Sequence, residues 1–278
     1  MALTDRLAAG SGLCARAHEL LDHAYAAGIR YFDVARSYGR AEEFLARWLR
    51  ERPDAGDVVV GSKWGYIYTA GWRIDAEVHE VKDHGVATFD RQLAETRALL
   101  GDRLDLYQVH SVTPDSPALH DTALHRRLGD LAAHGVVIGL STSGPSQAEA
   151  IRAALGVRTG GEPLFRSVQA TWNPLEPSAG PALAEAHEAG CLVIVKEALA
   201  NGRLAGRGDA AAGGATADAV ALATALHQPW ATIVLSGAAT VDQLASNLRA
   251  PALGPVPWEG LAVPAIDYWA DRSRLPWQ

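Results

Sequence analysis

Cysteine is nearly absent from this chain of 278 residues: only Cys14 and Cys191 occur, far apart in the sequence. Two isolated cysteines provide neither a disulfide framework nor the paired spacing of a zinc site. The sequence therefore does not belong to the class of small secreted domains that depend on disulfides. We expect both thiols to be packed side chains in a reducing compartment, and we predict a cytoplasmic location.

Long apolar runs and an excess of positive charge are also missing. No apolar stretch approaches the ~20 residues of a membrane-spanning helix, and the N-terminus lacks a basic segment followed by an apolar one. The formal net charge is −7, and the basic residues are scattered. We therefore predict a soluble protein that has neither a membrane nor nucleic acid as a partner.

What is present is the composition of a folded domain. Apolar residues make up 48% of the chain and charged residues 21%. This is enough apolar material for a large core, and it argues against disorder. The length suits one α/β barrel of ~250 residues. No internal repeat or low-complexity linker marks a boundary, so we predict a single domain over residues 1–278.

Short apolar runs alternate with segments of helical periodicity. The runs that predict strands are 30–34, 58–63, 104–109, 136–141, 167–171, 192–195 and 232–235. Helical patterns follow them at 42–50, 86–100, 122–133, 147–155, 182–189, 217–226 and 241–249, and one over 13–27 precedes the first. Strict alternation predicts a parallel sheet, and the number of units predicts a closed α/β barrel, the (β/α)8 TIM-type barrel, rather than an open sheet.

The strongest motif lies in residues 28–42. A helical pattern ends at a glycine, a short strand ends at Asp33, and the following loop presents Tyr38 before a second glycine. A strand that ends on an acid and leads into a tyrosine-bearing loop is typical of the catalytic end of a barrel. The stretch resembles the G-x-x-x-F-D-T-A-x-x-Y-G signature of the aldo-keto reductases, with Val34 in place of the family's threonine.

Two further strand ends extend this resemblance. Lys63 ends the second predicted strand and His110 follows the third, and with Asp33 and Tyr38 they match the family's catalytic tetrad. Singly, each residue has a plain structural explanation, such as a packed ring or a satisfied core histidine. Together they fall in the family's order at the end of the barrel where such enzymes keep their chemistry. We therefore predict that these four residues are catalytic.

The resemblance implies NAD(P)H-dependent reduction of an aldehyde or ketone to an alcohol, or the reverse reaction. The carbonyl oxygen needs an acid, and a free tyrosine with a pKa of ~10 donates poorly near neutrality. The family's division of labour implies that Lys63 lowers the pKa of the Tyr38 phenol and that Asp33 keeps Lys63 charged. It also implies that His110 binds the substrate oxygen. The implied partner is a small-molecule carbonyl compound or alcohol.

No G-x-G-x-x-G segment follows a strand, so the sequence does not indicate a Rossmann fold. The resemblance instead places a nicotinamide cofactor at the later strand ends. The cofactor-binding residues that it implies are Ser141, Thr142, Gln169, Asn173, Lys196, Leu199, Arg203, Arg207, Ser236, Gly237, Gln243 and Asn247. Lys196 stands where the family usually has the aromatic side chain that stacks on the nicotinamide.

We expect NADP (as NADPH) to be the cofactor rather than NAD, because NADPH is the family's default. Some members hold its 2′-phosphate with an arginine near the position of Gln243, and this chain lacks that arginine. Arg203 and Arg207 remain as cations, but they lie on a glycine-rich loop and would lose entropy on ordering. We therefore expect weak discrimination between the two cofactors.

The family's first strand is degenerate or missing in this sequence. It would precede Leu13, and Met1–Gly12 contains no clear strand pattern. This departure and Lys196 leave a second function open, that of a cofactor-binding barrel acting as a non-catalytic regulatory or scaffold subunit. The intact tetrad argues against it.

A long segment, 64–85, interrupts the alternation and is rich in aromatic residues. We expect a solvated loop there, acting as a lid over the substrate, because loops of this length are usually functional. Its possible metal ligands, His79, Glu80, Asp83 and His84, match no zinc spacing, so we predict no metal site.

Overall fold

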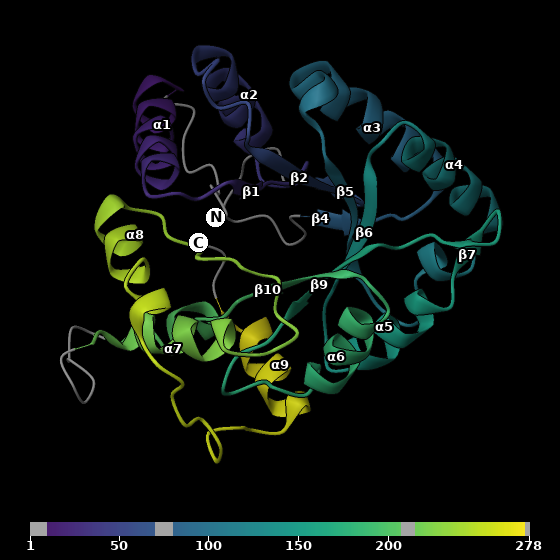
Figure 1. The fold of residues 1–278 in the computed structure, drawn as a ribbon. Helices are drawn as coiled ribbons and strands as arrows, with labels where there is room; N and C mark the ends of the chain where they lie inside the picture. Colours follow the sequence, from purple (N-terminus) through teal and green to yellow (C-terminus); the bar gives the residue numbers. More distant parts are fainter. Residues whose placement is uncertain (1–9, 70–79, 207–214, 276–278) are drawn as a thin grey trace.

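The computed structural model describes residues 10–69, 80–206 and 215–275. A sheet of seven parallel strands curls around a common axis, and helices cover its outer side (Figure 1). Its strands are β1 (Tyr31–Asp33), β2 (Val59–Trp64), β5 (Leu106–Val112), β6 (Val137–Thr142), β9 (Ser167–Thr171), β10 (Leu192–Lys196) and β11 (Ile233–Val234). All seven apolar runs that were predicted as strands contribute to this sheet.

The strands lie in the sheet in the order in which they occur in the chain. Each neighbouring pair is parallel, as the alternation of strands and helices predicted. Because each connection returns along the outside through a helix, all the strands end at the same rim of the curled sheet. Side chains from distant parts of the sequence therefore meet at this rim, which we call the mouth.

Eight helices of the described residues follow the predicted periodicity closely, whereas the one over Ala265–Ser273 was not predicted. The helices are α1 (Gly10–Ala26), α2 (Ala41–Glu51), α3 (Val86–Leu100), α4 (Thr122–Ala133), α5 (Gln147–Leu155), α6 (Gly180–Glu188), α7 (Ala217–Leu226), α8 (Val241–Asn247) and α9 (Ala265–Ser273). Short 3₁₀ turns lie at Gly101–Arg103, Pro117–Leu119, Ala200–Gly202 and Ala250–Ala252. Polar caps fix some helix starts: the Asp121 carboxylate accepts from the backbone N–H groups of Ala123 and Leu124, which begin α4.

The core fills both faces of the sheet. Every residue of β5 is buried, including the polar Gln108, His110 and Ser111, as expected for a strand covered on both faces. Trp48 of α2, Phe89 of α3 and Tyr107 of β5 pack in one apolar cluster. A second cluster surrounds Trp172 and Leu183, beneath α6 and α7.

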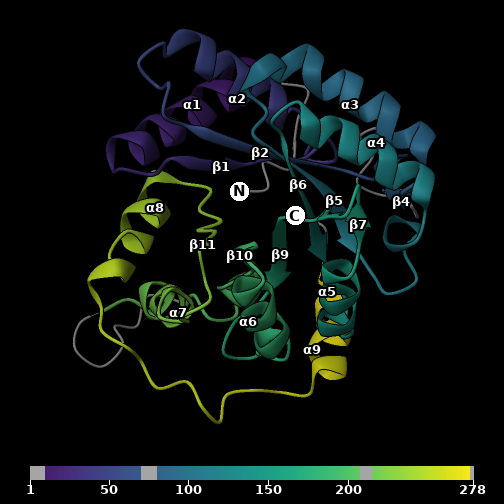
Figure 2. The ribbon, with the colours of Figure 1, turned by 45° about the vertical axis from the view of Figure 1, so that its right-hand side comes forward.

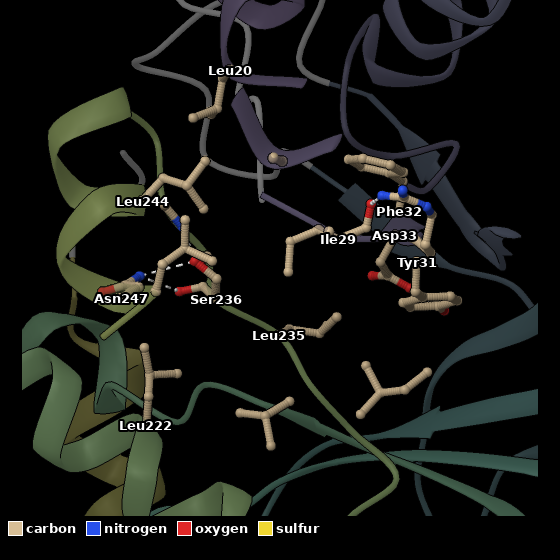
Figure 3. A pocket seen from close by; sticks show the side chains of 18 of the residues that line it. Leu20, Ile29, Tyr31, Phe32, Asp33, Leu222, Leu235, Ser236, Leu244 and Asn247 are labelled. Carbon is tan, nitrogen blue, oxygen red and sulfur yellow. Dashed lines mark hydrogen bonds between the residues drawn. The ribbon is translucent and has the colours of Figure 1, made fainter. Parts of the chain in front are cut away.

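The sheet does not close into the predicted eight-strand barrel within the described residues. β1 pairs only with β2, β11 pairs only with β10, and no strand joins them. Between them lies a cavity of about 370 Å³. Figure 3 shows apolar side chains such as Leu20, Ile29 and Leu235 facing this space. α1 and α8 pack against each other beside the gap (Figure 2).

The interpretation of the N-terminus needs a correction in one respect. The predicted helix begins at Gly10 rather than Leu13, so the end of the Met1–Gly12 stretch is helical and not a degenerate strand. Residues 1–9 lie outside the described part of the chain. The seventh strand and the first are consequently the two edges of the sheet.

The long segment 64–85 was predicted to be a loop, and this was partly wrong. Its described parts contain β3 (Tyr66–Tyr68) and β4 (Glu80–Lys82), which form an antiparallel pair. His79 lies outside the described residues. A second hairpin, β7 (Arg158–Thr159) with β8 (Glu162–Pro163), was also missed. Two- and three-residue strands carry too little periodicity to be recognised in a sequence.

Within the described ranges, none of the helices is long and apolar enough to cross a lipid bilayer. The cytoplasmic location inferred from the sequence stays a prediction. Cys14 and Cys191 are both buried free thiols.

Candidate active site

The four residues of the predicted tetrad meet at the mouth. Asp33 is the last residue of β1, Lys63 lies near the end of β2, and His110 lies in β5. Tyr38 occupies the loop between β1 and α2. β1, β2 and β5 are adjacent in the sheet, so their ends bring the four side chains together from three separate units.

Asp33 and Lys63 form a buried ion pair. The Lys63 ammonium donates to Asp33 Oδ2 and, over 2.9 Å, to the backbone carbonyl oxygen of Val34. The Lys63 and Asp33 side chains are 0% and 4% exposed, respectively. Burial lowers the pKa of Lys63, and the Asp33 carboxylate opposes this shift. Lys63 is thereby held in one orientation with its charge balanced.

The second oxygen of the Asp33 carboxylate accepts hydrogen bonds from three further side chains. Tyr31 Oη donates to Oδ1 over 3.0 Å, Gln169 Nε2 over 3.1 Å and Gln108 Nε2 over 3.4 Å. These donors come from β1, β9 and β5. A carboxylate with this many partners has little freedom to move, so it serves as a fixed anchor for Lys63.

Tyr38 lies beside both Lys63 and His110. The Lys63 ammonium is 5.0 Å from the centre of the Tyr38 ring. The same ring meets the His110 ring edge-on, with 5.6 Å between the ring centres. In the structure the pKa of the Tyr38 phenol is raised, first by burial and then by the negative charges of Asp33, Glu197 and Glu80.

This direction is opposite to the lowering expected from Lys63. The Lys63 charge is neutralised by Asp33, which lies in direct contact with it, so burial decides the shift. A phenol that keeps its proton is available as a donor. It gives up this proton readily only when negative charge develops on the substrate oxygen that accepts it.

His110 is held neutral. Burial, Lys63 and Lys196 together lower the pKa of its imidazole well below the usual value. Nδ1 lies 3.4 Å from Ser37 Oγ, and the ring meets Tyr66 edge-on at 5.0 Å between ring centres. A neutral imidazole can donate one hydrogen bond to an oxygen at the mouth without adding charge.

The backbone after His110 is strained. Ser111 has a φ of 59°, a conformation that residues other than glycine rarely adopt. Ser141 Oγ accepts from its backbone N–H over 2.9 Å, and the Lys82 ammonium donates to its carbonyl oxygen over 2.7 Å. These two contacts fix the turn that presents His110.

Several residues predicted to bind the cofactor form hydrogen bonds to other residues of the protein. Ser141 supports Ser111, and Thr142 donates to Gln147 Oε1 over 3.2 Å. Gln169 donates to Asp33. Ser141, Thr142 and Gln169 are at most 1% exposed. The structure brings them close to the tetrad, but it assigns them structural partners.

Among these residues, Asn173 has the most complete set of hydrogen bonds within the protein. Its amide nitrogen donates to the carbonyl oxygen of Glu197 and contacts Tyr268 Oη, both over 3.0 Å. Its amide oxygen accepts from the backbone N–H groups of Leu175 and Glu176. With every hydrogen-bonding position used and the side chain fully buried, Asn173 ties the end of β9 to β10 and α9.

Lys196 ends β10, and Leu199 and Arg203 follow it in the next loop. Leu199 packs against the second apolar cluster. Arg203 Nε donates to the carbonyl oxygen of Ala200 over 3.1 Å, and the guanidinium lies 4.2 Å from the centre of the Tyr268 ring. Arg207 lies outside the described residues.

The remaining predicted cofactor residues surround α8. Ser236 and Asn247 hydrogen-bond through their side chains over 2.9 Å (Figure 3). Gln243 Oε1 accepts from the backbone N–H of Ala239 over 2.9 Å. Gly237 has a φ of 66°, which only glycine adopts without strain.

The residues that border the cavity fit a nicotinamide cofactor in one respect. The cavity between β1 and β11 is bordered by Asp33 of the tetrad and also by Ser236, Gly237 and Asn247. One elongated ligand can therefore border both predicted sets. Among the described residues, no group of three or more acidic, histidine or cysteine side chains could hold a metal ion.

Sequence reasoning missed several residues at the mouth. Arg272 of α9 forms a two-pronged ion pair with Glu197, its Nε lying 3.0 Å from each carboxylate oxygen. Thr171 Oγ1 donates to the same carboxylate over 3.1 Å. The negative charge of Glu80, in β4, contributes to raising the pKa of Tyr38, and burial raises the pKa of Glu80 itself to about 7. In the sequence, Glu80 was considered only as a possible metal ligand, and Glu197 was visible only as the neighbour of Lys196.

A curled parallel sheet covered by helices is the architecture of TIM-type barrels. The sequence model described as "Aldo/keto reductase family" matches residues 14–213. The chain therefore belongs to the aldo-keto reductase family, as the resemblance indicated.

Individual relatives agree with this assignment. The chain is 28% identical over 194 residues to the aldo-keto reductase str7 of Strobilurus tenacellus, covering 68% of this chain and 52% of that protein. It is 30% identical over 171 residues to pyridoxal 4-dehydrogenase of Microbacterium luteolum, covering 51% and 49% of the two chains. The chain thus spans about half the length of the curated relatives it matches.

Among solved structures, the fold is similar to the holo form of aldo-keto reductase AKR11C1 from Bacillus halodurans. The TM-score is 0.71 at 22% identity, and the match covers 93% of this chain and 87% of that one. This likeness supports the fold of nearly the whole chain.

Proposed function

We propose that the protein is an NAD(P)H-dependent oxidoreductase that interconverts an aldehyde or ketone with its alcohol. The convergence of Tyr38, Lys63, Asp33 and His110 at the mouth is the observation that carries this proposal. Membership of the aldo-keto reductase family supports the general reaction. The substrate is a small carbonyl compound or alcohol.

The roles follow from the contacts. Tyr38 keeps its proton in the free protein and donates it to the carbonyl oxygen of the substrate. Lys63 lies beside the ring and stabilises the phenolate that forms, while Asp33 holds Lys63 in place. Neutral His110 orients the carbonyl oxygen next to Tyr38. The bound nicotinamide supplies the hydride.

NADPH is the cofactor that we propose, with weak preference over NADH. Ser236, Gly237, Gln243 and Asn247 would hold its phosphate and adenine end, since they lie together around α8. The choice between the two cofactors would rest on Arg203 and Arg207. The affinities for NADPH and NADH in the parent and in Arg207→Ala test this part: an unchanged ratio would show that another cation holds the 2′-phosphate.

The reaction is tested by following NADPH absorbance with a panel of aldehydes in the parent, in Tyr38→Phe and in Tyr107→Phe. Tyr107 is a buried tyrosine whose hydroxyl lies 3.5 Å from Thr96 Oγ1, so it controls for loss of a buried hydroxyl. We expect Tyr38→Phe to lose turnover and keep its NADPH affinity, while Tyr107→Phe keeps both. Full turnover in Tyr38→Phe would refute the role of Tyr38 as the acid.

The unclosed sheet favours one second candidate, a cofactor-binding barrel that acts as a regulatory or scaffold subunit. The same assay separates the two. Binding of NADPH without turnover of any reactive aldehyde would support the second candidate.

A further inference from the structure

Lysine is rare in this protein, and its positions are not random. Of the 25 basic residues only three are lysines: Lys63, Lys82 and Lys196. All three lie at or next to the mouth, in β2, β4 and β10. An ammonium group is a compact, strongly hydrated charge, whereas arginine serves well on the surface. All other residues among these 25 are arginines, and the three lysine ammonium groups lie around one space.

Two of these amines have clear protein acceptors. Lys63 donates to Asp33 and to the Val34 carbonyl oxygen, and Lys82 donates to the Ser111 carbonyl oxygen over 2.7 Å. Lys196 differs. Its side chain is only 16% exposed, yet no acceptor among the described residues lies within hydrogen-bond distance of its ammonium. The nearest carboxylate oxygen, Glu197 Oε1, is 3.7 Å away.

Glu197 is already engaged by other donors. Arg272 Nε lies 3.0 Å from each of its oxygens, and Thr171 Oγ1 lies 3.1 Å from Oε2. Burial alone would raise the pKa of Glu197, but Lys196 and Arg272 lower it to about 2. Its backbone is fixed in the left-handed region, with a φ of 56°. Glu197 is thus shared between Arg272, which lies in direct contact with it, and Lys196, whose ammonium lies farther away.

Lys196 belongs to the side of the mouth where a carbonyl substrate would lie. Its charge, with that of Lys63, helps to lower the pKa of His110. Arg272 acts on Tyr66, whose ring lies 5.0 Å from that of His110, and His110 in turn lies 5.6 Å from Tyr38. The residues proposed to bind the carbonyl oxygen and the Lys196 ammonium therefore surround the same space.

Glu197 forms ion pairs with both Lys196 and Arg272, so one carboxylate faces two positive groups and one positive charge is in excess. Asp33 balances Lys63. A largely buried ammonium whose carboxylate partner is 3.7 Å away is poorly satisfied, because it has lost water and gained no close hydrogen bond in return. A ligand oxygen with negative charge would satisfy it.

We propose that Lys196 recognises a carboxylate on the substrate, so that the protein acts on carbonyl compounds that carry an acid group. This inference rests on the proposed reductase function. The Arg272–Glu197 pair is a positioning element: it holds the end of β10, and Arg272 engages both Glu197 oxygens more closely than Lys196 does.

The kinetic test uses a matched pair of substrates, 4-carboxybenzaldehyde and its neutral ester, methyl 4-formylbenzoate. We expect the parent to prefer the acid. In Lys196→Met, kcat/KM for the acid should fall roughly tenfold to a hundredfold through KM, the range of one charge-assisted hydrogen bond. The ester should be affected far less, and Lys196→Arg, which keeps the charge, should recover part of the preference.

Equal losses for both aldehydes, together with weaker NADPH binding, would place Lys196 on a phosphate of the cofactor and overturn the proposal. NADPH affinity is therefore measured directly, by fluorescence titration, in the parent and in each variant. A parent that reduces the ester as well as the acid would also overturn it.

A second measurement needs no turnover, and the signal that is absent from Lys196→Arg identifies Lys196. Lysine labelled with ¹³C at Cε gives one signal for each of the three lysines of the chain. We expect the Lys196 signal to shift with 4-(hydroxymethyl)benzoate and not with the neutral 1,4-benzenedimethanol. If the parent reduces neither aldehyde, the proposed function fails, and this shift alone decides the inference. An unmoved Lys196 signal would overturn it, including when Lys196→Met does not fold.

Discussion

Gln169 Nε2 donates a hydrogen bond to Asp33 Oδ1 over 3.1 Å, from β9 on one side of the curled sheet to β1 on the other. The two residues are 136 positions apart in the chain. Family resemblance assigned Gln169 to the cofactor and Asp33 to catalysis. Their contact means that Gln169 also supports the carboxylate that anchors Lys63, so its loss should affect stability as well as any ligand.

Gln169→Leu should lower the free energy of unfolding by about 1–3 kcal/mol, the cost of leaving a buried acceptor with one donor fewer. Urea unfolding measures this. Gln228→Leu is the control, because Gln228 is partly exposed and donates only to the Thr224 carbonyl oxygen. It should change stability by less than about 0.5 kcal/mol. If Gln169→Leu weakens NADPH binding and leaves stability untouched, the contact with Asp33 is unimportant.

Lys63→Met should be much more destabilising, by about 3–5 kcal/mol, since it leaves the Asp33 carboxylate buried without its cation. The double variant Lys63→Met with Asp33→Asn removes both charges and should recover a large part of that loss. Urea unfolding of the parent, the two single variants and the double variant gives the coupling free energy. Additive losses would contradict a buried, coupled pair.

Glu80 gives a prediction about pH. Burial raises its pKa in the folded protein from 4.5 to about 7, against a hydrogen bond from Ser37. Between these pH values the folded protein keeps a proton that the unfolded chain has released, so Glu80 makes stability fall as pH rises from about 4.5 to about 7. His84 acts in the opposite direction, since its pKa is lowered from 6.5 to about 4.

Comparing the parent with Glu80→Gln cancels the contribution of His84. We expect equal melting temperatures near pH 4.5 and a variant that is the more stable of the two above pH 7. Glu149→Gln, at an exposed position of α5, is the control for the change from Glu to Gln. A constant difference between the parent and Glu80→Gln would show that Glu80 does not titrate in this range.

The sequence was sufficient for the repeating part of the fold. Each βα unit carries its own apolar run and helical periodicity, so the seven strands and helices such as α3, α5 and α7 could be read locally. Asp33, Lys63 and His110 could be placed at the mouth because parallel strands end at one rim. These inferences needed no knowledge of contacts between distant residues.

Other features depend on such contacts. Arg272 reaches Glu197 across 75 positions of sequence, and no local pattern marks either residue. Asn173 matches a family position, but its hydrogen bonds to Glu197 and Tyr268 exist only once β10 and α9 are in place. The direction of the Tyr38 pKa shift was also beyond the sequence, because it follows from burial and from Asp33 balancing Lys63.

The last prediction concerns the two edges of the sheet. Within the described part of the chain, β1 and β11 each pair on one side only, and the cavity between them is open where Ile29 and Leu226 are 36% and 40% exposed. Unpaired strand edges next to apolar surface favour association with another chain. We therefore expect the chain of 278 residues to associate as its concentration rises, and sedimentation velocity over a concentration series measures this.

Ile29→Lys should weaken that association, because a charge at the edge of β1 opposes the approach of a second strand. Ile266→Lys is the matched control: Ile266 is 70% exposed on α9 and does not border the cavity. If exposed apolar area alone drove association, Ile266→Lys would weaken it at least as much, because its side chain is the more exposed. A parent that sediments as a single monomeric species at every concentration would show that α1 and α8 protect the edges well enough without a partner strand.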